Sequence, residues 1–107
     1  MIHLNIGSNL ESTYGSRVDN ISAAINLLTK TQIKIKKISN IFETPSYPNQ
    51  NFSKFLNVGL TIDYENNHFK LLQEIKLIEK KLGRVKTKKN DPRIIDIDII
   101  DFKNEIK

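Results

Sequence analysis

The sequence predicts an α+β fold of the ferredoxin-like type, a four-stranded antiparallel sheet with two helices on one face. Two hydrophobic periods alternate along the 107 residues. A period of two is typical of strands, and a period of three to four is typical of helices. Their order is strand, helix, strand, strand, helix, strand, which is the βαββαβ order of that fold. Because no repeat or second domain is evident, residues 1–107 are expected to form a single domain.

The first half of the chain supplies a strand, a helix and a second strand. Apolar residues alternate from Ile2 to Ile6, and residues 7–9 are expected to end this strand in a turn. No Gly-Lys-Ser/Thr follows, so this turn is not a phosphate-binding P-loop. Segment 32–36 then alternates as a strand, and a bulge at 37–38 would return Ile38 to the core side. Between the two strands, a helix capped by Ser16 and Asp19 is expected to bury Val18, Ile21, Ile25 and Leu28.

A loop and the clearest strand of the chain come next. Residues 43–54 contain two prolines and no period, which predicts a loop. On the strand that follows, Phe55 and Asn57 share one face, where an aromatic ring beside an amide would suit a planar heterocycle. The alternative is that Phe55 packs under the loop and Asn57 binds its backbone. The opposite, core-facing side is expected to carry Leu56, Val58, Leu60, Ile62 and Tyr64.

A second helix is expected from residue 68 to residue 82, with Gly83 as its stop signal. Glu79 lies on the apolar side of this helix, where a carboxylate needs a cationic or hydrogen-bonding partner. The basic segment that begins at Arg84 can supply one, either as a structural ion pair or as part of a functional site. The expected apolar stripe consists of Phe69, Leu72, Ile75, Ile78 and Leu82.

The last expected strand, residues 93–101, combines an apolar face with an acidic one. Asp96 and Asp98 point to the same side, roughly 7 Å apart at the backbone, where they can bind a divalent cation or a pair of them. The alternative is an edge strand whose aspartates face water and oppose aggregation. In the predicted topology these aspartates and Asn57 can share the uncovered face of the sheet. The segment just upstream carries five cations able to bind phosphates: Arg84, Lys86, Lys88, Lys89 and Arg93.

Composition sets outer limits on function. The net charge of +5 favours anionic partners but does not choose between a nucleotide and a nucleic acid. The absence of cysteine excludes disulfides and thiolate metal sites and agrees with a reducing compartment. No stretch approaches the roughly 20 apolar residues of a membrane span. We therefore expect a cytoplasmic protein without a membrane partner.

Five short motifs occur in a fixed order between residue 2 and about residue 102. They are Ile6-Gly7-Ser8-Asn9-Leu10, Glu43-Thr44-Pro45, Phe55-Leu56-Asn57, Ile78-Glu79-x-x-Leu82-Gly83-Arg84 and Pro92-Arg93-x-Ile95-Asp96-Ile97-Asp98-Ile99. In order and spacing they resemble the 6-hydroxymethyl-7,8-dihydropterin pyrophosphokinase family. The resemblance implies an enzyme of folate biosynthesis that transfers pyrophosphate from ATP to 6-hydroxymethyl-7,8-dihydropterin, giving the pterin diphosphate and AMP.

The resemblance also implies roles for individual residues. Asp96 and Asp98 would bind two Mg²⁺ ions that bridge to ATP. Together with Arg84 and Arg93 they would form the catalytic set. Phosphate-binding cations would be Arg84, Lys86, Lys89 and Arg93, with the acidic Glu79 positioning the site. The pterin would lie against Phe55 and Asn57, with Thr44, Pro45 and Tyr47 lining the same pocket.

The sequence departs from the family pattern at several positions. Lys86 and Lys89 replace expected arginines, so they offer point charges in place of bidentate groups. The basic loop is one residue shorter, which leaves the choice between Lys88 and Lys89 open. Family members also continue beyond the Asp-x-Asp strand with a His-Pro type motif, an ATP-binding arginine and a second pterin-stacking aromatic. The chain ends at Lys107 without them, which suggests a truncated product or a shortened, weakly active or inactive relative.

Two other function classes remain open at this stage. A nucleic-acid-binding ferredoxin-like module would use exposed aromatic residues on central strands and basic loops. Two aspartates on the open face oppose that function unless metal is bound. A catalytically silent domain that self-associates through its sheet is the other alternative. The preferred prediction is a monomer that binds ATP and a reduced pterin, with no nucleic acid and no membrane partner.

Overall fold

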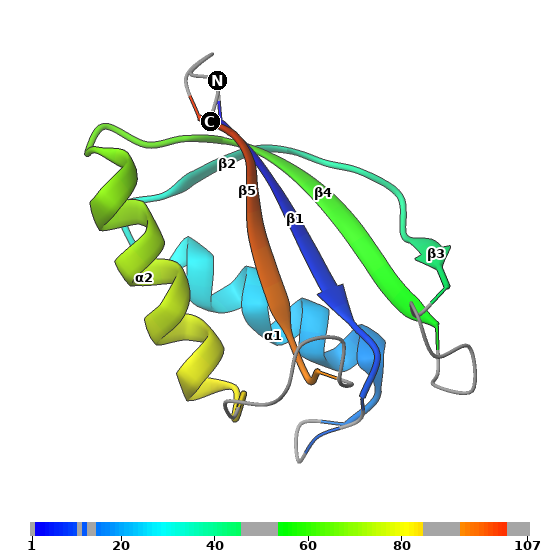
Figure 1. Cartoon of the computed structure of the whole chain (residues 1–107). Helices are drawn as coiled ribbons and strands as arrows, with labels where there is room; N and C mark the ends of the chain where they lie inside the picture. Colours follow the sequence, from blue (N-terminus) through cyan, green and yellow to red (C-terminus); the bar gives the residue numbers. More distant parts are fainter. Residues whose placement is uncertain (1, 11, 13–14, 46–53, 85–92, 103–107) are drawn as a thin grey trace.

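The computed structural model describes residues 2–10, 12, 15–45, 54–84 and 93–102. Five antiparallel strands form one sheet, and both helices lie against the same face of it (Figure 1). None of the described helices is long and apolar enough to cross a membrane. The elements in chain order are β1 (Ile2–Ser8), α1 (Arg17–Thr29), β2 (Lys34–Ile38), β3 (Phe42–Thr44), β4 (Phe55–Asp63), α2 (His68–Lys81) and β5 (Asp96–Phe102).

The sheet has one strand more than the sequence predicted. The order β2-β4-β1-β5 puts β1 and β4 at the centre, as expected, and the added strand β3 pairs with the beginning of β4. Residues 43 and 44 were therefore wrongly predicted to lie in a loop. Three residues are too few to show a period, and the hydrogen bonds that make β3 a strand come from residues 55–57 of β4, which lie more than ten positions further along the chain.

The core lies between the helices and the sheet. The predicted inward face of β4 is confirmed, because its four predicted residues, and Tyr64 directly after the strand, are all 9% exposed or less. The bulge in β2 is present between Ile35 and Lys37, but Ile38 is 55% exposed, contrary to prediction. This difference has a simple cause: α1 packs against β1 and β4 more than against the outer strand β2.

Both helices bury slightly different stripes from those predicted. Val18 of α1 is exposed, whereas Ile21, Ala24 and Leu28 are buried. In α2, Phe69 is 73% exposed and Leu72 is also exposed. The buried stripe of α2 consists of Leu71, Ile75, Ile78 and Leu82. Ile75, Ile78 and Leu82 belong to the predicted stripe and to the observed one, so the helical period alone does not choose between the two stripes.

Candidate active site

The register of the central strands brings the predicted site residues onto one face of the sheet. Gly7 of β1 pairs with Asn57 of β4 on one side and with Asp96 of β5 on the other. Two residues earlier, Asn5 pairs in the same way with Gly59 and Asp98. Directly paired residues point to the same side of a sheet. The prediction that Asn57, Asp96 and Asp98 share the face opposite the helices is therefore confirmed. Asn57 and Asp96 are about 10 Å apart at the backbone, which is twice the strand spacing.

Gly7 gives space to the side chains of β4. A Cβ atom at this position would lie 3.0 Å from Oδ1 of Asn57 and 3.3 Å from Cδ1 of Phe55. Such close contacts would push both side chains away from β1. The absence of a side chain at Gly7 therefore allows the ring and the amide to lie over β1, between β4 and the aspartates.

Hydrogen bonds hold Asn57 from both sides. Its Nδ2 donates to Thr44 Oγ1 at 2.9 Å, and its Oδ1 accepts from Asn5 Nδ2 at 3.1 Å. Asn57 is buried, Phe55 and Thr44 are half-buried, and Pro45 is exposed directly after β3. Asn5 is a site residue that the sequence analysis missed. Only the pairing register, which puts it beside both Gly59 and Asp98, could have identified it.

Two arginines bind the first aspartate of β5. Arg84 Nη1 lies 3.3 Å from Asp96 Oδ1, and Arg93 Nη1 lies 3.4 Å from Asp96 Oδ2. Arg84 Nη1 also donates to Glu79 Oε2 at 2.6 Å, and that same oxygen accepts the backbone N–H of Ile97 at 2.8 Å. Glu79 thus lies behind the site, where it anchors Arg84 and satisfies a donor of β5.

Burial and neighbouring charges shift the pKa values of two carboxyl groups. Burial raises the pKa of Glu79, and the Ile97 N–H and the Arg84 guanidinium oppose that rise. Asp98 is exposed as a whole residue, yet partial desolvation of its carboxylate, then the charge and hydrogen bond of Asp96, raise its pKa to about 6. When Asp96 and Asp98 are both ionised, their carboxylates therefore repel each other, and a bound cation would relieve that repulsion.

The cation set and the acidic pair fit a magnesium–triphosphate ligand. Within the described ranges, no group of three or more His, Cys, Asp or Glu side chains could hold a metal ion by itself. Mg²⁺ commonly uses one or two protein carboxylates and takes its other ligands from phosphates and water. Nε of Arg93 is buried without a hydrogen-bond partner among the described residues.

The end of α2 determines where Arg84 lies. Gly83 has φ +93°, its N–H donates to Lys80 O, and the N–H of Arg84 donates to Glu79 O. These two bonds form a Schellman motif, which ends a helix by turning the chain back toward its last turn. This turn keeps Arg84 on the side of the helix that carries Glu79, and the predicted stop at Gly83 is confirmed.

Replacing Gly83 by alanine should destabilise the protein by about 1 to 2 kcal/mol, because a Cβ atom is unfavourable at positive φ. The nearest neighbour of that Cβ would be Ile94 Cδ1 at 3.7 Å, an ordinary contact, so backbone strain accounts for the loss. Urea unfolding measures it. Gly83→Asn should lose less, since asparagine tolerates this conformation better; equal losses for both variants would contradict this explanation.

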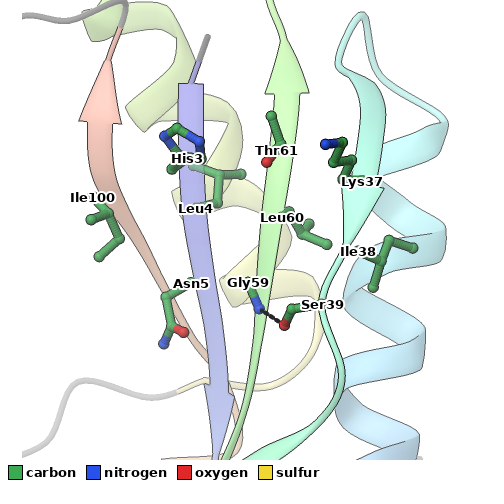
Figure 2. A pocket seen from close by; sticks show the side chains of 10 residues that line it. All are labelled: His3, Leu4, Asn5, Lys37, Ile38, Ser39, Gly59, Leu60, Thr61 and Ile100. Atoms are coloured by element: carbon green, nitrogen blue, oxygen red, sulfur yellow. Dashed lines mark hydrogen bonds between the residues drawn. The ribbon is translucent and has the colours of Figure 1, made fainter.

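A hollow of about 410 Å³ adjoins the site on the same face of the sheet. Figure 2 shows Ile100 of β5 and Ile38 of β2 on opposite sides of it, with Asn5 and Gly59 between them. The N–H of Gly59 donates to Ser39 Oγ at 2.8 Å. Because Asn5 also binds Asn57, the hollow and the candidate site share a wall.

Of the predicted site residues, Tyr47, Lys86, Lys88 and Lys89 lie outside the described residues. The described members of the set nevertheless form two groups on the sheet. One consists of Thr44, Pro45, Phe55 and Asn57 on or next to β3 and β4, and the other of Glu79, Arg84, Arg93, Asp96 and Asp98 around the start of β5.

Comparisons with known proteins show which sequences this chain is similar to. The chain is 36% identical over 105 residues to the 2-amino-4-hydroxy-6-hydroxymethyldihydropteridine pyrophosphokinase of Aquifex aeolicus, matching 98% of this chain and 62% of that protein. It is 32% identical over 104 residues to the Bacillus subtilis protein of the same name, matching 96% of this chain and 60% of that protein. A folic acid synthesis protein, fol1 of Pneumocystis carinii, is 33% identical over 105 residues, which are 98% of this chain and 14% of that protein.

The chain thus spans about 60% of the length of these two bacterial relatives. The family model described as 7,8-dihydro-6-hydroxymethylpterin-pyrophosphokinase matches residues 3–106, nearly the whole chain. The match includes all the site positions named above. The chain therefore belongs to the 7,8-dihydro-6-hydroxymethylpterin-pyrophosphokinase family.

Proposed function

We propose that the protein transfers the pyrophosphoryl group of ATP to the hydroxymethyl group of 6-hydroxymethyl-7,8-dihydropterin, giving the pterin diphosphate and AMP. Family membership supports the reaction. The observation that carries the proposal is the row Asn57–Gly7–Asp96 across three strands. In this row a side chain suited to a planar heterocycle and a carboxylate suited to a metal–phosphate group lie on the same face of the sheet, and Gly7 between them has no side chain.

The pterin would bind at the β3 and β4 end of this row. Its ring would stack on Phe55, and its polar edge would meet Asn57. An amide oxygen accepts two hydrogen bonds, and Asn5 uses one acceptor position of Asn57 Oδ1, so the other remains for an N–H of the heterocycle. The bonds from Asn5 and to Thr44 would fix the amide plane before the substrate arrives, with Pro45 and Tyr47 completing the pocket.

The triphosphate would bind at the β5 end of the row. Arg84 and Arg93 would present guanidinium groups to phosphate oxygens, as Lys86 and Lys89 would present ammonium groups. Two Mg²⁺ ions held by Asp96 and Asp98 would neutralise the charge of the triphosphate and align its β-phosphorus with the pterin hydroxyl. Glu79 would keep Arg84 in place from behind.

This reaction needs no covalent nucleophile on the protein. Phosphoryl transfer is catalysed chiefly by positioning and by stabilisation of negative charge. The two groups of side chains supply these functions separately. One orients the acceptor hydroxymethyl group, and the other holds the phosphate chain.

The proposal also covers the type of fold, the domain organisation, the oligomeric state and the location of the protein. We infer that the four longer strands and the two helices form a ferredoxin-like domain with β3 added, supported by the order β2-β4-β1-β5. A single domain over residues 1–107, a monomeric state, a cytoplasmic location and the absence of nucleic-acid or membrane partners remain predictions.

Product analysis tests the proposed function. The protein is incubated with ATP, the hydroxymethyl-dihydropterin and MgCl₂, and the products are separated by chromatography. AMP and pterin diphosphate are expected in equal amounts, with neither formed when the pterin is omitted or EDTA is added. ADP in place of AMP would contradict the proposal. So would the absence of AMP together with tight RNA binding that needs no magnesium and weakens steeply with salt.

A further inference from the structure

We propose that Asn9 is a positioning residue that sets the place of Arg93 in the site. The inference rests on the proposed function, in which Arg93 binds a phosphate of ATP. Asn9 belongs to the Gly7-Ser8-Asn9 segment, which the sequence suggested was only a turn. The strand β1 instead continues through Ser8, and Asn9 follows directly as a buried residue.

Asn9 binds both backbone polar groups of Arg93. The Asn9 N–H donates to Arg93 O at 3.1 Å, and Asn9 Oδ1 accepts from Arg93 N at 2.7 Å. The side-chain oxygen of Asn9 thus takes the acceptor role that a backbone carbonyl has in an antiparallel pair. Arg93 lies before the first paired residue of β5, Asp96, so these two bonds extend the β1–β5 contact to a residue outside the regular ladder.

Helix α1 holds the segment that makes these two hydrogen bonds to Arg93. Asn20 of α1 is fully buried, and its Nδ2 donates to Leu10 O at 2.9 Å and to Ser8 Oγ at 3.3 Å. The residues on each side of Asn9 are therefore held to the helix. Asn9 connects this fixed segment to Arg93, whose guanidinium contacts Asp96.

The type of side chain at position 9 matters for this role. The hydroxyl oxygen of serine lies one bond closer to the backbone than Oδ1 of Asn9 and cannot reach the Arg93 N–H in the same way. Aspartate would keep the acceptor but would add a negative charge near Asp96 and the phosphates. Asparagine is long enough to accept from the Arg93 N–H and carries no charge. Both properties are needed in a residue that positions a phosphate-binding arginine.

Displacement of Arg93 should impair the handling of ATP. In positioned reactions a shift of about 1 Å can cost on the order of 10²-fold in rate. We expect Asn9→Ala to lower kcat/KM for ATP by about 10- to 100-fold, up to the cost of such a shift. The KM for the pterin should change by less than about twofold, because Asn57 and Phe55 lie on another strand and keep their own contacts.

A double-mutant cycle tests whether Asn9 acts through Arg93. Asn9→Ala, Arg93→Ala and the double variant are compared by steady-state kinetics with ATP varied. If Asn9 acts by positioning Arg93, the double variant should be no worse than Arg93→Ala alone. The inference would be overturned if the loss in kcat/KM of the double variant equalled the product of the two single losses. Wild-type kinetics for Asn9→Ala would overturn it as well.

A matched control separates positioning from general stability. Asn67→Ala removes the N-terminal cap of α2, where the Asn67 side chain accepts a hydrogen bond from the Lys70 N–H at 2.9 Å. This cap lies at the opposite end of the helix from Gly83, roughly 21 Å away. Asn67→Ala should lower the melting temperature while leaving the kinetics unchanged. Should Asn9→Ala fail to fold, Asn9→Ser keeps a polar side chain without the reach to Arg93 and should show the same kinetic loss; wild-type kinetics for Asn9→Ser would overturn the inference.

The inference and the proposed function fail in distinguishable ways. A large loss in Arg93→Ala with no loss in Asn9→Ala overturns only the role of Asn9. Wild-type kinetics in Arg93→Ala, or no AMP from the wild-type protein, overturns the proposed site and the inference that rests on it.

Discussion

Replacing Asp98 by asparagine should slow AMP formation about 10³-fold and, in the absence of metal, make the protein more stable. Asp98 contributes half of the carboxylate pair that is proposed to hold Mg²⁺. Loss of that charge should remove several kcal/mol of transition-state stabilisation, about a 10³-fold loss in rate. In the metal-free protein the same carboxylate is repelled by Asp96, so its neutral analogue relieves a cost.

The gain in stability should depend on pH. Burial and Asp96 raise the pKa of folded Asp98 to about 6, above its unfolded value near 4. Because the pKa is higher in the folded state, the wild type has its full free energy of unfolding at low pH, where Asp98 is protonated. That free energy falls as pH rises through about 6, where folded Asp98 becomes charged. Asp98→Asn should therefore match the wild type near pH 4 in EDTA and melt a few degrees higher at pH 8, as measured by thermal unfolding.

Asp101→Asn is the matched control for this experiment. It makes the same change three residues further along β5, where Asp101 pairs with His3 at 3.6 Å, away from Asp96. It should leave AMP formation unchanged. Full activity of Asp98→Asn, or equal activity losses in both variants, would argue against the proposed metal site.

Replacing Glu79 by alanine should lower the free energy of unfolding by about 3 kcal/mol, the range for breaking a buried charge pair from one side. The variant leaves the Ile97 N–H without its acceptor and Arg84 without its closest carboxylate. Because Arg84 then loses its fixed position, AMP formation should fall as well. Urea unfolding and the coupled AMP assay measure the two effects.

Glu79→Gln separates these two contributions. The amide oxygen of glutamine can still accept the Ile97 N–H, whereas the ion pair with Arg84 is lost. Since burial already disfavours the charged form of Glu79, this variant should keep most of the stability but lose activity. Glu65→Ala, at an exposed position, should change stability by no more than about 0.5 kcal/mol. A Glu79→Ala protein as stable as the wild type would refute the structural role of Glu79.

Several features of the fold and site follow from local rules and were predictable from the chain. The alternation of side chains along a strand placed Leu56, Val58 and Leu60 in the core and Asp96 and Asp98 on the open face. The glycine stop signal placed the end of α2, and the apolar surroundings of Glu79 indicated a partner, which is Arg84. Each inference needed only residues close in sequence.

Other features depended on contacts between distant segments. Strand β3 exists only because β4 pairs with it, and the buried stripe of α2 begins at Leu71 because of how the helix lies on the sheet. Asn5 and Asn9 looked like ordinary polar residues until the register placed them beside Asn57 and Arg93. No local pattern distinguishes them.

The sequence by itself determined which side chains of β4 face the core, where the second helix stops, and that two carboxylates share a face. Backbone geometry imposes these relations within a few residues, so any fold of the chain would keep them. Only the tertiary structure decided that Gly7 stands between Asn57 and Asp96 and that Asn9 holds Arg93. These relations join residues 50 to 90 positions apart, and the pairing of β1 with both neighbours creates them.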